Sequence, residues 1–252
     1  MSAAILYTSF LFTLCQAITF ASDGEKENLS PNVKHQWEKQ DNTIHQEKLK
    51  GLEDVGREAR SMAPQNSHPL NLRGKLGETH LAQLKSPGFN KIYLTQAFGP
   101  NNHPAFYNGY LKITPDVINP NVQVLNLRGC GLRNKNLEEI YLFQNLEELC
   151  LSGNPVNNEV VNILPLWKNL KILHIALTEI DDECLKMISQ MPNLVELDIS
   201  VCSKITEEGI KYLKNSTNLK KLIMKSAKVS PETYQSLQRE GLEIIYFPSS
   251  GF

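Results

Sequence analysis

The sequence predicts an α/β solenoid, in which short parallel strands form a concave sheet and short helices form the convex side. Three observations predict this fold. Apolar residues recur at intervals of 24, 24, 24, 25 and 23 residues along the second half of the chain. Each recurrence begins with the pattern L-x-x-L-x-L, which is typical of a strand with one buried face. A pair of apolar residues three positions apart then follows, as on the buried face of a short helix.

The strand segments come first in each unit. The six units begin at Val122, Leu146, Leu170, Leu194, Leu219 and Leu242. Three residues later come Leu125, Leu149, Leu173, Leu197, Leu222 and Ile245, and five residues later come Leu127, Leu151, Ile175, Ile199, Met224 and Phe247. These two columns are the predicted core of the sheet.

The helix segments are predicted by a second pair of columns and by the residues ahead of them. In the first five units the columns are Leu137, Val161, Leu185, Ile210 and Tyr234, then Ile140, Leu164, Ile188, Leu213 and Leu237. Ser230 followed by Pro231 is a helix start, and the acids after Asp181 and Thr206 suit the positive end of a helix dipole. Pro165 predicts a short or distorted helix in the second unit.

Each unit must stack on its neighbours, because one strand and one short helix cannot bury their apolar faces alone. Stacking places the strands side by side in a parallel sheet and the helices in a row behind it. Helices are wider than strands, so we expect the sheet to curve inward.

The repeated unit resembles the leucine-rich repeat. The segment from Leu146 to Val156 reads LEELCLSGNPV, and the unit from Leu194 to Asn218, with Cys202, is similar to the cysteine-containing repeats of F-box substrate receptors. The resemblance covers residues 122–247, half of the chain. It implies a leucine-rich-repeat solenoid, and it implies protein binding without identifying a target.

The remaining residues divide by composition. Residues 1–21 are apolar and end in small residues, which predicts a secretory signal peptide, with an uncleaved membrane anchor as the alternative. Residues 22–77 are polar and predict a flexible tether. Residues 78–121 form a degenerate first repeat and N-terminal cap, with a long aromatic loop from Gln96 to Tyr110 that either caps or binds. Residues 248–252 are a tail. The protein is therefore expected to be secreted or extracytoplasmic.

Charge and motifs exclude several functions. Lys plus Arg is 26 and Asp plus Glu is 27, a net charge of -1, which argues against nucleic-acid binding. The sequence contains no phosphate-binding glycine loop, no His-Glu-x-x-His and no Cys-x-x-Cys. We therefore expect no cofactor, no metal and no small-molecule substrate, and the protein is not expected to be an enzyme.

Four cysteines follow the signal segment: Cys130, Cys150, Cys184 and Cys202. None has an obvious disulfide partner, so we expect buried free thiols. In this family the position of Cys130 and Cys202 points inward and satisfies backbone groups of a turn, which the resemblance implies here.

The residue between the last two leucines of each strand should face the concave side. This column reads Asn126, Cys150, His174, Asp198, Ile223 and Tyr246. Cys150, His174 and Asp198 lie on successive strands, an order that suits a thiol nucleophile with His174 as its base and Asp198 holding the ring. With Glu148 or Glu196 the same trio suits zinc. An open sheet offers no oxyanion donors and excludes little water, so a contact surface is the preferred interpretation.

We predict that this contact surface binds a protein partner. The predicted contact residues are Glu148, His174, Glu196, Asp198, Lys221, Lys225 and Tyr246. The alternative is an adaptor or substrate receptor in ubiquitin ligation, such as an exported effector; a thiol or zinc enzyme is a third hypothesis. A membrane is a partner only if the N-terminal segment is uncleaved.

Overall fold

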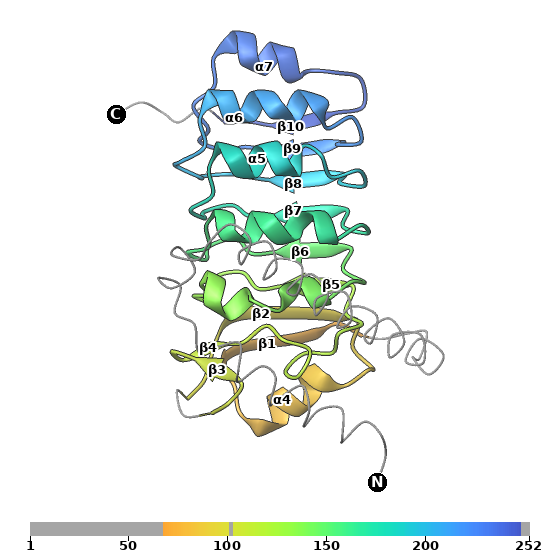
Figure 1. The fold of residues 1–252 in the computed structure, drawn as a ribbon, viewed down its shortest axis with the longest axis vertical. Helices are drawn as coiled ribbons and strands as arrows, with labels where there is room; N and C mark the ends of the chain where they lie inside the picture. Colours follow the sequence, from red (N-terminus) through yellow and green to blue (C-terminus); the bar gives the residue numbers. More distant parts are fainter. Residues whose placement is uncertain (1–67, 101–102, 248–252) are drawn as a thin grey trace, which may run out of the picture. The chain divides into compact units, whose positions relative to one another are not determined.

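An eight-stranded parallel sheet organises the protein. The computed structural model describes residues 68–100 and 103–247, all of which belong to one compact unit, residues 52–252. The strands lie in the order β1-β2-β5-β6-β7-β8-β9-β10, each beside the next along the stack (Figure 1). They are β1 (Leu70–Lys75), β2 (Lys91–Phe98), β5 (Val124–Asn126), β6 (Glu148–Cys150), β7 (Ile172–His174), β8 (Glu196–Asp198), β9 (Lys221–Ile223) and β10 (Glu243–Ile245). The predicted α/β solenoid is confirmed.

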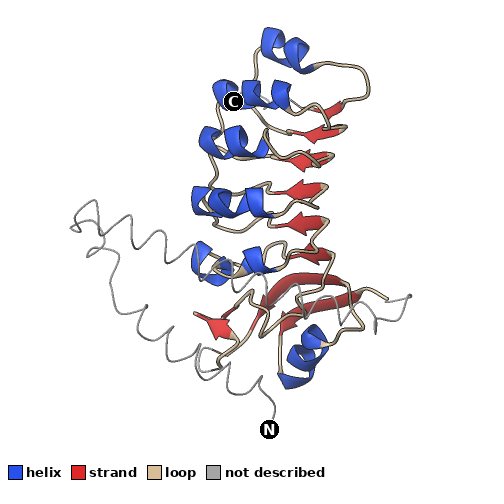
Figure 2. Ribbon diagram, turned by 45° about the vertical axis from the view of Figure 1, so that its right-hand side comes forward, coloured by secondary structure: helices blue, strands red, loops and turns tan. Residues whose placement is uncertain are grey.

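Helices cover one side of this sheet (Figure 2). They are the 3₁₀ helices η1 (Asn134–Leu137), η2 (Ile140–Leu142), η3 (Asn158–Leu166) and η4 (Tyr212–Asn215), and the α-helices α5 (Asp182–Ile188), α6 (Glu207–Lys211) and α7 (Pro231–Leu237). Pro165 lies inside η3, and the predicted distortion of that helix is confirmed. The side chains of Asp181, Thr206 and Ser230 cap α5, α6 and α7 by accepting backbone N–H bonds.

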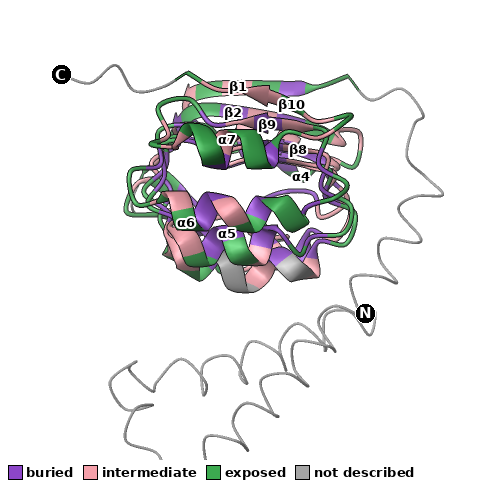
Figure 3. Cartoon of the chain, turned by 90° about the horizontal axis from the view of Figure 1, so that it is seen from above, coloured by how far each residue is buried: buried purple, intermediate pink, exposed green. Residues whose placement is uncertain are grey.

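The apolar core lies between sheet and helices (Figure 3). Leu125, Leu173, Leu197 and Leu222 have no exposed surface, and Leu149 has 1%. The helix columns meet them from the other side, with Leu185 and Ile188 of α5 also fully buried. The two predicted strand columns are thus confirmed in the first five units.

The last unit differs by one residue from the prediction. Leu222 and Ile223 of β9 pair with Ile244 and Ile245 of β10, so Ile244 continues the core column and Ile245 lies on the opposite face. A one-residue shift of register moves every side chain to the other face of a sheet. The last interval is therefore 22 residues, from Lys221 to Glu243, and the predicted alignment of the sixth unit was wrong.

The sheet also begins earlier than predicted. The expected tether, residues 22–77, was to include Leu70, yet residues 70–75 form β1 and pair with β2 in parallel, Leu70 opposite Ile92 and Leu72 opposite Leu94. The alternation of Leu70 and Leu72 gives this short segment the apolar side that a strand needs. The tether boundary at residue 77 was wrong for this reason.

A helix and a hairpin complete the N-terminal end. Helix α4 (Glu78–Lys85) lies at the β1 end of the stack and buries Leu81 and Leu84 (Figure 1). Strands β3 (Phe106–Tyr107) and β4 (Tyr110–Leu111) form an antiparallel hairpin within the predicted long loop. Asn108 and Gly109 turn it with φ of 49° and 79°, the left-handed conformation that an Asn-Gly hairpin turn uses.

Several predictions concern residues outside the described ranges. The signal peptide (1–21), most of the tether (22–67) and the tail (248–252) all lie there. Among the residues that are described, no helix has the length and apolar character needed to cross a membrane.

The open sheet face as a candidate functional site

The candidate site is the face of the sheet turned away from the helices, called the open face below. Strand alternation brings three columns of side chains onto it. The first column is Val124, Glu148, Ile172, Glu196, Lys221 and Glu243; the second is Asn126, Cys150, His174, Asp198, Ile223 and Ile245. The third, just past the strands, is Arg128, Ser152, Ala176, Ser200, Lys225 and Phe247.

A chain of interacting side chains crosses four strands of this face. Cys150, on β6, pairs in register with His174, on β7, and the interaction of the two lowers the pKa of the thiol and raises that of the imidazole. The Nε2 atom of His174 lies 3.0 Å from Oε1 of Glu196 on β8, and Nζ of Lys221 on β9 lies 3.2 Å from the same oxygen. Cys150, His174, Glu196 and Lys221 therefore form one network, named the open-face network below.

The third member of the predicted trio is corrected by this geometry. Asp198 pairs in register with His174, as predicted, but its carboxylate accepts the backbone N–H of Ser200 at 2.9 Å. The carboxylate that meets the ring of His174 belongs to Glu196, two residues earlier on the same strand. Asp198 is drawn to its own turn because an Asp side chain readily bonds the backbone two residues ahead.

The thiol of Cys150 lies in a small polar cradle. The backbone and the hydroxyl of Ser152 and the ring of His174 lower the pKa of this thiol. Oγ of Ser152 also accepts the backbone N–H of Ala176 at 3.1 Å, which fixes that hydroxyl. Cys150 is 8% exposed, so the predicted solvent-facing thiol is largely covered.

The groups of the open-face network shift one another's pKa values. Burial raises the pKa of the Cys150 thiol, but the hydrogen bonds from His174 and Ser152 outweigh burial and bring that pKa below its usual range. The hydrogen bond to Cys150 raises the pKa of His174, desolvation opposes this, and Glu196 adds to the rise. Burial raises the pKa of Glu196, yet His174 and Lys221 together bring it below its usual value. The network thus shifts Cys150 toward its thiolate form and His174 toward its imidazolium form.

The other three cysteines have a different environment. All four described cysteines are free and buried, which confirms that prediction. Sγ of Cys130 donates to the carbonyl of Leu94 at 3.6 Å, and Sγ of Cys202 donates to the carbonyl of Ile175 at 3.2 Å. Burial raises the pKa of Cys130, Cys184 and Cys202. The inward position of Cys130 and Cys202, implied by the family resemblance, agrees with these turn contacts.

Tyr246 was predicted on the open face, and the structure contradicts this. Because the last unit is shifted by one residue, Tyr246 packs against the core and against the ring of Tyr234 from α7, with ring centroids 5.4 Å apart. Phe247 takes the open-face position instead and is 61% exposed. The ammonium of Lys225 lies 5.8 Å from the centroid of the Phe247 ring. The other predicted residues, Glu148 included, lie on the open face.

The open face continues beyond the repeats. Tyr93 of β2 pairs with Asn126, and Asn71 of β1 pairs with Tyr93, so both extend the second column. Neither was among the predicted site residues. The alternation of Ile92 with Leu94 could have located Tyr93, because the residue between two buried strand positions faces the other side.

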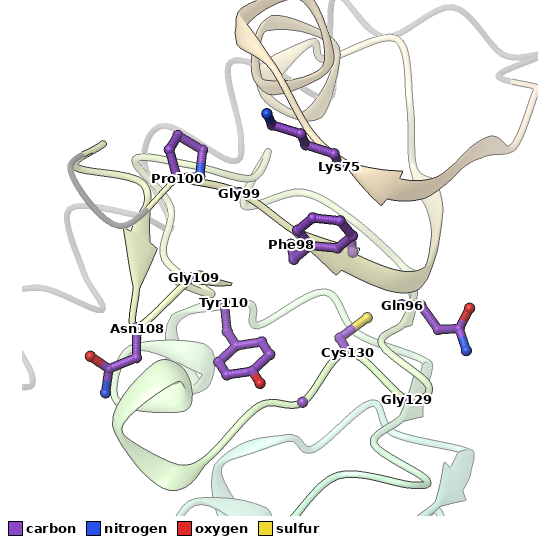
Figure 4. A pocket seen from close by; sticks show the side chains of 12 residues that line it. Lys75, Gln96, Phe98, Gly99, Pro100, Asn108, Gly109, Tyr110, Gly129 and Cys130 are labelled. Carbon is purple, nitrogen blue, oxygen red and sulfur yellow. The ribbon is translucent and has the colours of Figure 1, made fainter.

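A cavity of about 910 Å³ lies beside this face, at the carboxyl ends of β1 and β2. Phe98 and Tyr110 line it together with Lys75, and Cys130 borders it (Figure 4). The hairpin that forms its wall is anchored by Phe106, which is 4% exposed. The aromatic loop Gln96–Tyr110 therefore packs against the end of the solenoid through Phe106 and presents other rings to solvent.

The zinc hypothesis finds no support in this part of the chain. Within residues 68–100 and 103–247, no group of three or more His, Cys, Asp or Glu side chains is arranged to hold a metal ion. The predicted trio does not assemble as a metal site because the carboxylate of Asp198 accepts the backbone N–H of Ser200 and does not meet the ring of His174.

Solved structures show the same fold. No protein-family model matches the chain, and no curated protein matches its sequence. The structure is similar to the crystal structure of an internalin (inlF) from Listeria monocytogenes, with a TM-score of 0.50 and 16% identity over 72% of this chain and 48% of the internalin. An internalin C2 (inlC2) from the same organism matches with a TM-score of 0.45 and 19% identity over 64% of this chain and 72% of that protein. The chain spans about half the length of the first internalin. The fold is that of a leucine-rich-repeat solenoid.

Proposed function

We propose that this chain is a protein-recognition module that binds a protein partner through its open face. One observation carries the proposal. Eight parallel strands present their side chains in register on one continuous surface, and in the described part of the chain the helices of the repeats lie behind the sheet (Figure 2). A surface of this kind offers many contacts from a rigid scaffold.

The scaffold favours binding because it is preorganised. Side chains on regular strands lose little freedom when a partner docks, whereas ordering a flexible loop costs free energy. The open-face network adds to this by fixing His174 and Glu196 before any partner arrives.

The charge pattern indicates what kind of partner surface would fit. Acidic side chains gather at the centre, Glu148, Glu196 and Asp198, and the basic side chains Lys221 and Lys225 lie toward the β10 end. Exposed Phe247 and half-buried Ile223 supply apolar contact near that end. The matching partner surface would carry basic groups opposite β6–β8 and apolar or acidic groups opposite β9–β10.

The proposed contact residues follow from these positions. They are Glu148, His174, Glu196, Asp198, Lys221, Lys225 and Phe247. Tyr246 is no longer among them, because it packs inward. Export from the cytoplasm is part of the proposal and rests on the pattern of residues 1–21 alone.

The test compares two charge-reversal variants of the full chain. Glu196→Lys with Asp198→Lys changes the centre of the open face. Glu138→Lys with Glu240→Lys makes the same change of charge at exposed positions away from that face. The wild type and both variants are immobilised, exposed to extract and medium from the source cells, and the bound proteins are quantified by mass spectrometry.

We expect the open-face variant to lose about tenfold or more of the proteins that the wild type and the control variant both retain, because a reversed charge opposite a complementary one costs several kcal/mol. Equal recovery by all three chains would reject the assignment of the open face. Equal loss in both variants would point to net charge rather than to a defined surface.

A further inference from the structure

We propose that Cys150 is a covalent modification site that undergoes exchange with small disulfides, with His174 as its base. Cys150 and His174 lie side by side and in register on the neighbouring strands β6 and β7. Glu196 holds the far side of the ring at 3.0 Å. A thiol, an imidazole and a carboxylate in this order form the arrangement that activates cysteine nucleophiles.

Exposure does not distinguish Cys150 from its nearest counterpart. Cys150 and Cys202 are each 8% exposed. Their neighbours differ, however. Cys202 donates its proton to the carbonyl of Ile175, a bond that exists only while the thiol is protonated. Neighbouring donors lower the pKa of both thiols, but of the two cysteines Cys150 alone lies in register with an imidazole, that of His174.

The pKa directions agree with this geometry. Burial works against the Cys150 thiolate, but the surrounding hydrogen bonds bring its pKa below the usual range, whereas burial raises the pKa of Cys202. A reactive cysteine requires thiolate, because the thiolate is the nucleophile.

The reaction balances without another reactant. His174 takes the proton of Cys150, and the thiolate attacks one sulfur of a disulfide R–S–S–R. A new S–S bond forms between Cys150 and one R–S group while the original S–S bond breaks. The other R–S⁻ leaves and receives the proton from His174. Cys150 is oxidised and the leaving sulfur is reduced, so no further oxidant or reductant takes part.

The surroundings indicate the class of disulfide. Cys150 is largely covered, so a small molecule reaches it more readily than the rigid disulfide of a folded protein. The charged and titratable groups around it are Glu148 on β6, Glu196 and Asp198 on β8 and Lys221 on β9, with Tyr93 and Arg128 toward β2 and β5. Three carboxylates against few cations favour a neutral or cationic disulfide over an anionic one.

The experiment treats the folded full chain with dithiodipyridine, a small neutral disulfide. The modified cysteine-containing peptides are quantified over time by mass spectrometry, so that each cysteine gives its own rate. We expect Cys150 to react at least about tenfold faster than Cys202 at neutral pH, because thiolate fraction sets the rate when exposure is equal. The same chain in urea should show similar rates at both sites.

Three variants test the roles of the neighbours. His174→Gln should slow Cys150 by about fivefold or more at neutral pH and move the midpoint of its pH–rate profile upward, since the base is lost. Glu196→Gln should move that midpoint in the same direction by less, because Glu196 acts through His174. Asn126→Ser is the matched control, because Asn126 pairs with Cys150 from the strand on the opposite side, β5. Its side chain accepts the backbone N–H of Arg128. This substitution should leave the rate of Cys150 unchanged.

Cys202 reports folding in every variant, because it should stay slow until urea is added. With folding so verified, a Cys150 rate equal to that of Cys202 would overturn the proposal. An unchanged pH–rate profile in His174→Gln would equally overturn the role of the base. Neither result depends on whether the open face binds a protein.

Discussion

Cys150 and Cys202 carry the same side chain at the same exposure in neighbouring parts of one fold, yet they belong to different columns of the repeat. Cys202 belongs to the column at the end of each strand, called the turn column below: Cys130, Asn154, Thr178 and Cys202. Its members point inward and bond the backbone of the turns. Cys150 belongs to the second column of the open face, where side chains bond one another.

The difference shows which positions of the repeat are constrained. In these four units the turn-column side chain donates a hydrogen bond to a backbone carbonyl, and an unpaired buried carbonyl would cost free energy; the fifth unit has Ala227 at this position. Cys, Asn and Thr all supply this donor. An open-face side chain has no such role, so thiol, imidazole, carboxylate and isoleucine follow one another in one column. Function can vary there without loss of the fold.

Asn154 should show the largest effect of this difference. Its side chain, 1% exposed, donates to the carbonyls of Leu127 and Leu151 at 2.9 and 2.8 Å and accepts the N–H of Leu132 at 3.0 Å. Asn154→Ala removes all three bonds at once. We expect a loss of about 3 kcal/mol or more in the free energy of unfolding, measured by urea denaturation.

Asn126 provides the matched control, since it is an asparagine on the open face. Its carboxamide accepts only the N–H of Arg128 among the contacts found, and water can replace that bond. Asn126→Ala should therefore change the unfolding free energy by less than about 1 kcal/mol. Similar losses for the two alanine variants would remove the distinction between the columns.

Alanine substitutions at the two cysteines should differ in their loss of unfolding free energy in the same direction as those at the two asparagines, but by less. Cys202→Ala removes one of two donors from the carbonyl of Ile175, which keeps the hydroxyl of Thr178 at 2.6 Å, and we expect this to cost about 1 kcal/mol. Cys150→Ala should cost about 0.5 kcal/mol or less, as at other open-face positions. Cys202→Ser keeps a donor and should restore part of the loss. Urea denaturation of the three variants gives the comparison.

The fold was predictable from the sequence because a solenoid repeats its constraints. Every unit must bury the same columns, so the spacing of residues such as Leu149 and Leu197 predicts the strand positions from the sequence alone. The ends were not predictable in the same way. At the last unit the interval shortens to 22 residues, and apolar residues at both Ile244 and Ile245 fit either register. At the N-terminal end, β1 follows a polar segment, and only Leu70 and Leu72 distinguish it from that segment.

The candidate site was predictable in its columns but not in its contacts. Spacing placed Cys150 beside His174, since register follows from the repeat. It could not decide between Asp198 and Glu196 as the partner of the ring, because that choice depends on side-chain reach. The shorter Asp198 bonds its own turn, and the longer Glu196 reaches across to the neighbouring strand. The thiol contacts of Ser152 depend likewise on the shape of one turn.

The smallest effect should come from the protonation of His174. Its pKa is raised in the folded chain, first by Cys150, against desolvation, and then by Glu196. A group whose folded pKa is raised stabilises the fold fully below its unfolded pKa, about 6.5, and this stability is lost as pH rises through the folded pKa. The unfolding free energy of the wild type minus that of His174→Gln should therefore be larger near pH 6 than near pH 9, by roughly 0.5 kcal/mol or less, because the ring is partly exposed.

In a Glu196→Gln background this difference should shrink, since one cause of the raised pKa is gone. A difference that grows with pH would show that the lowered pKa of Cys150, which His174 supports and which stabilises the fold more as pH rises, outweighs the raised pKa of the ring.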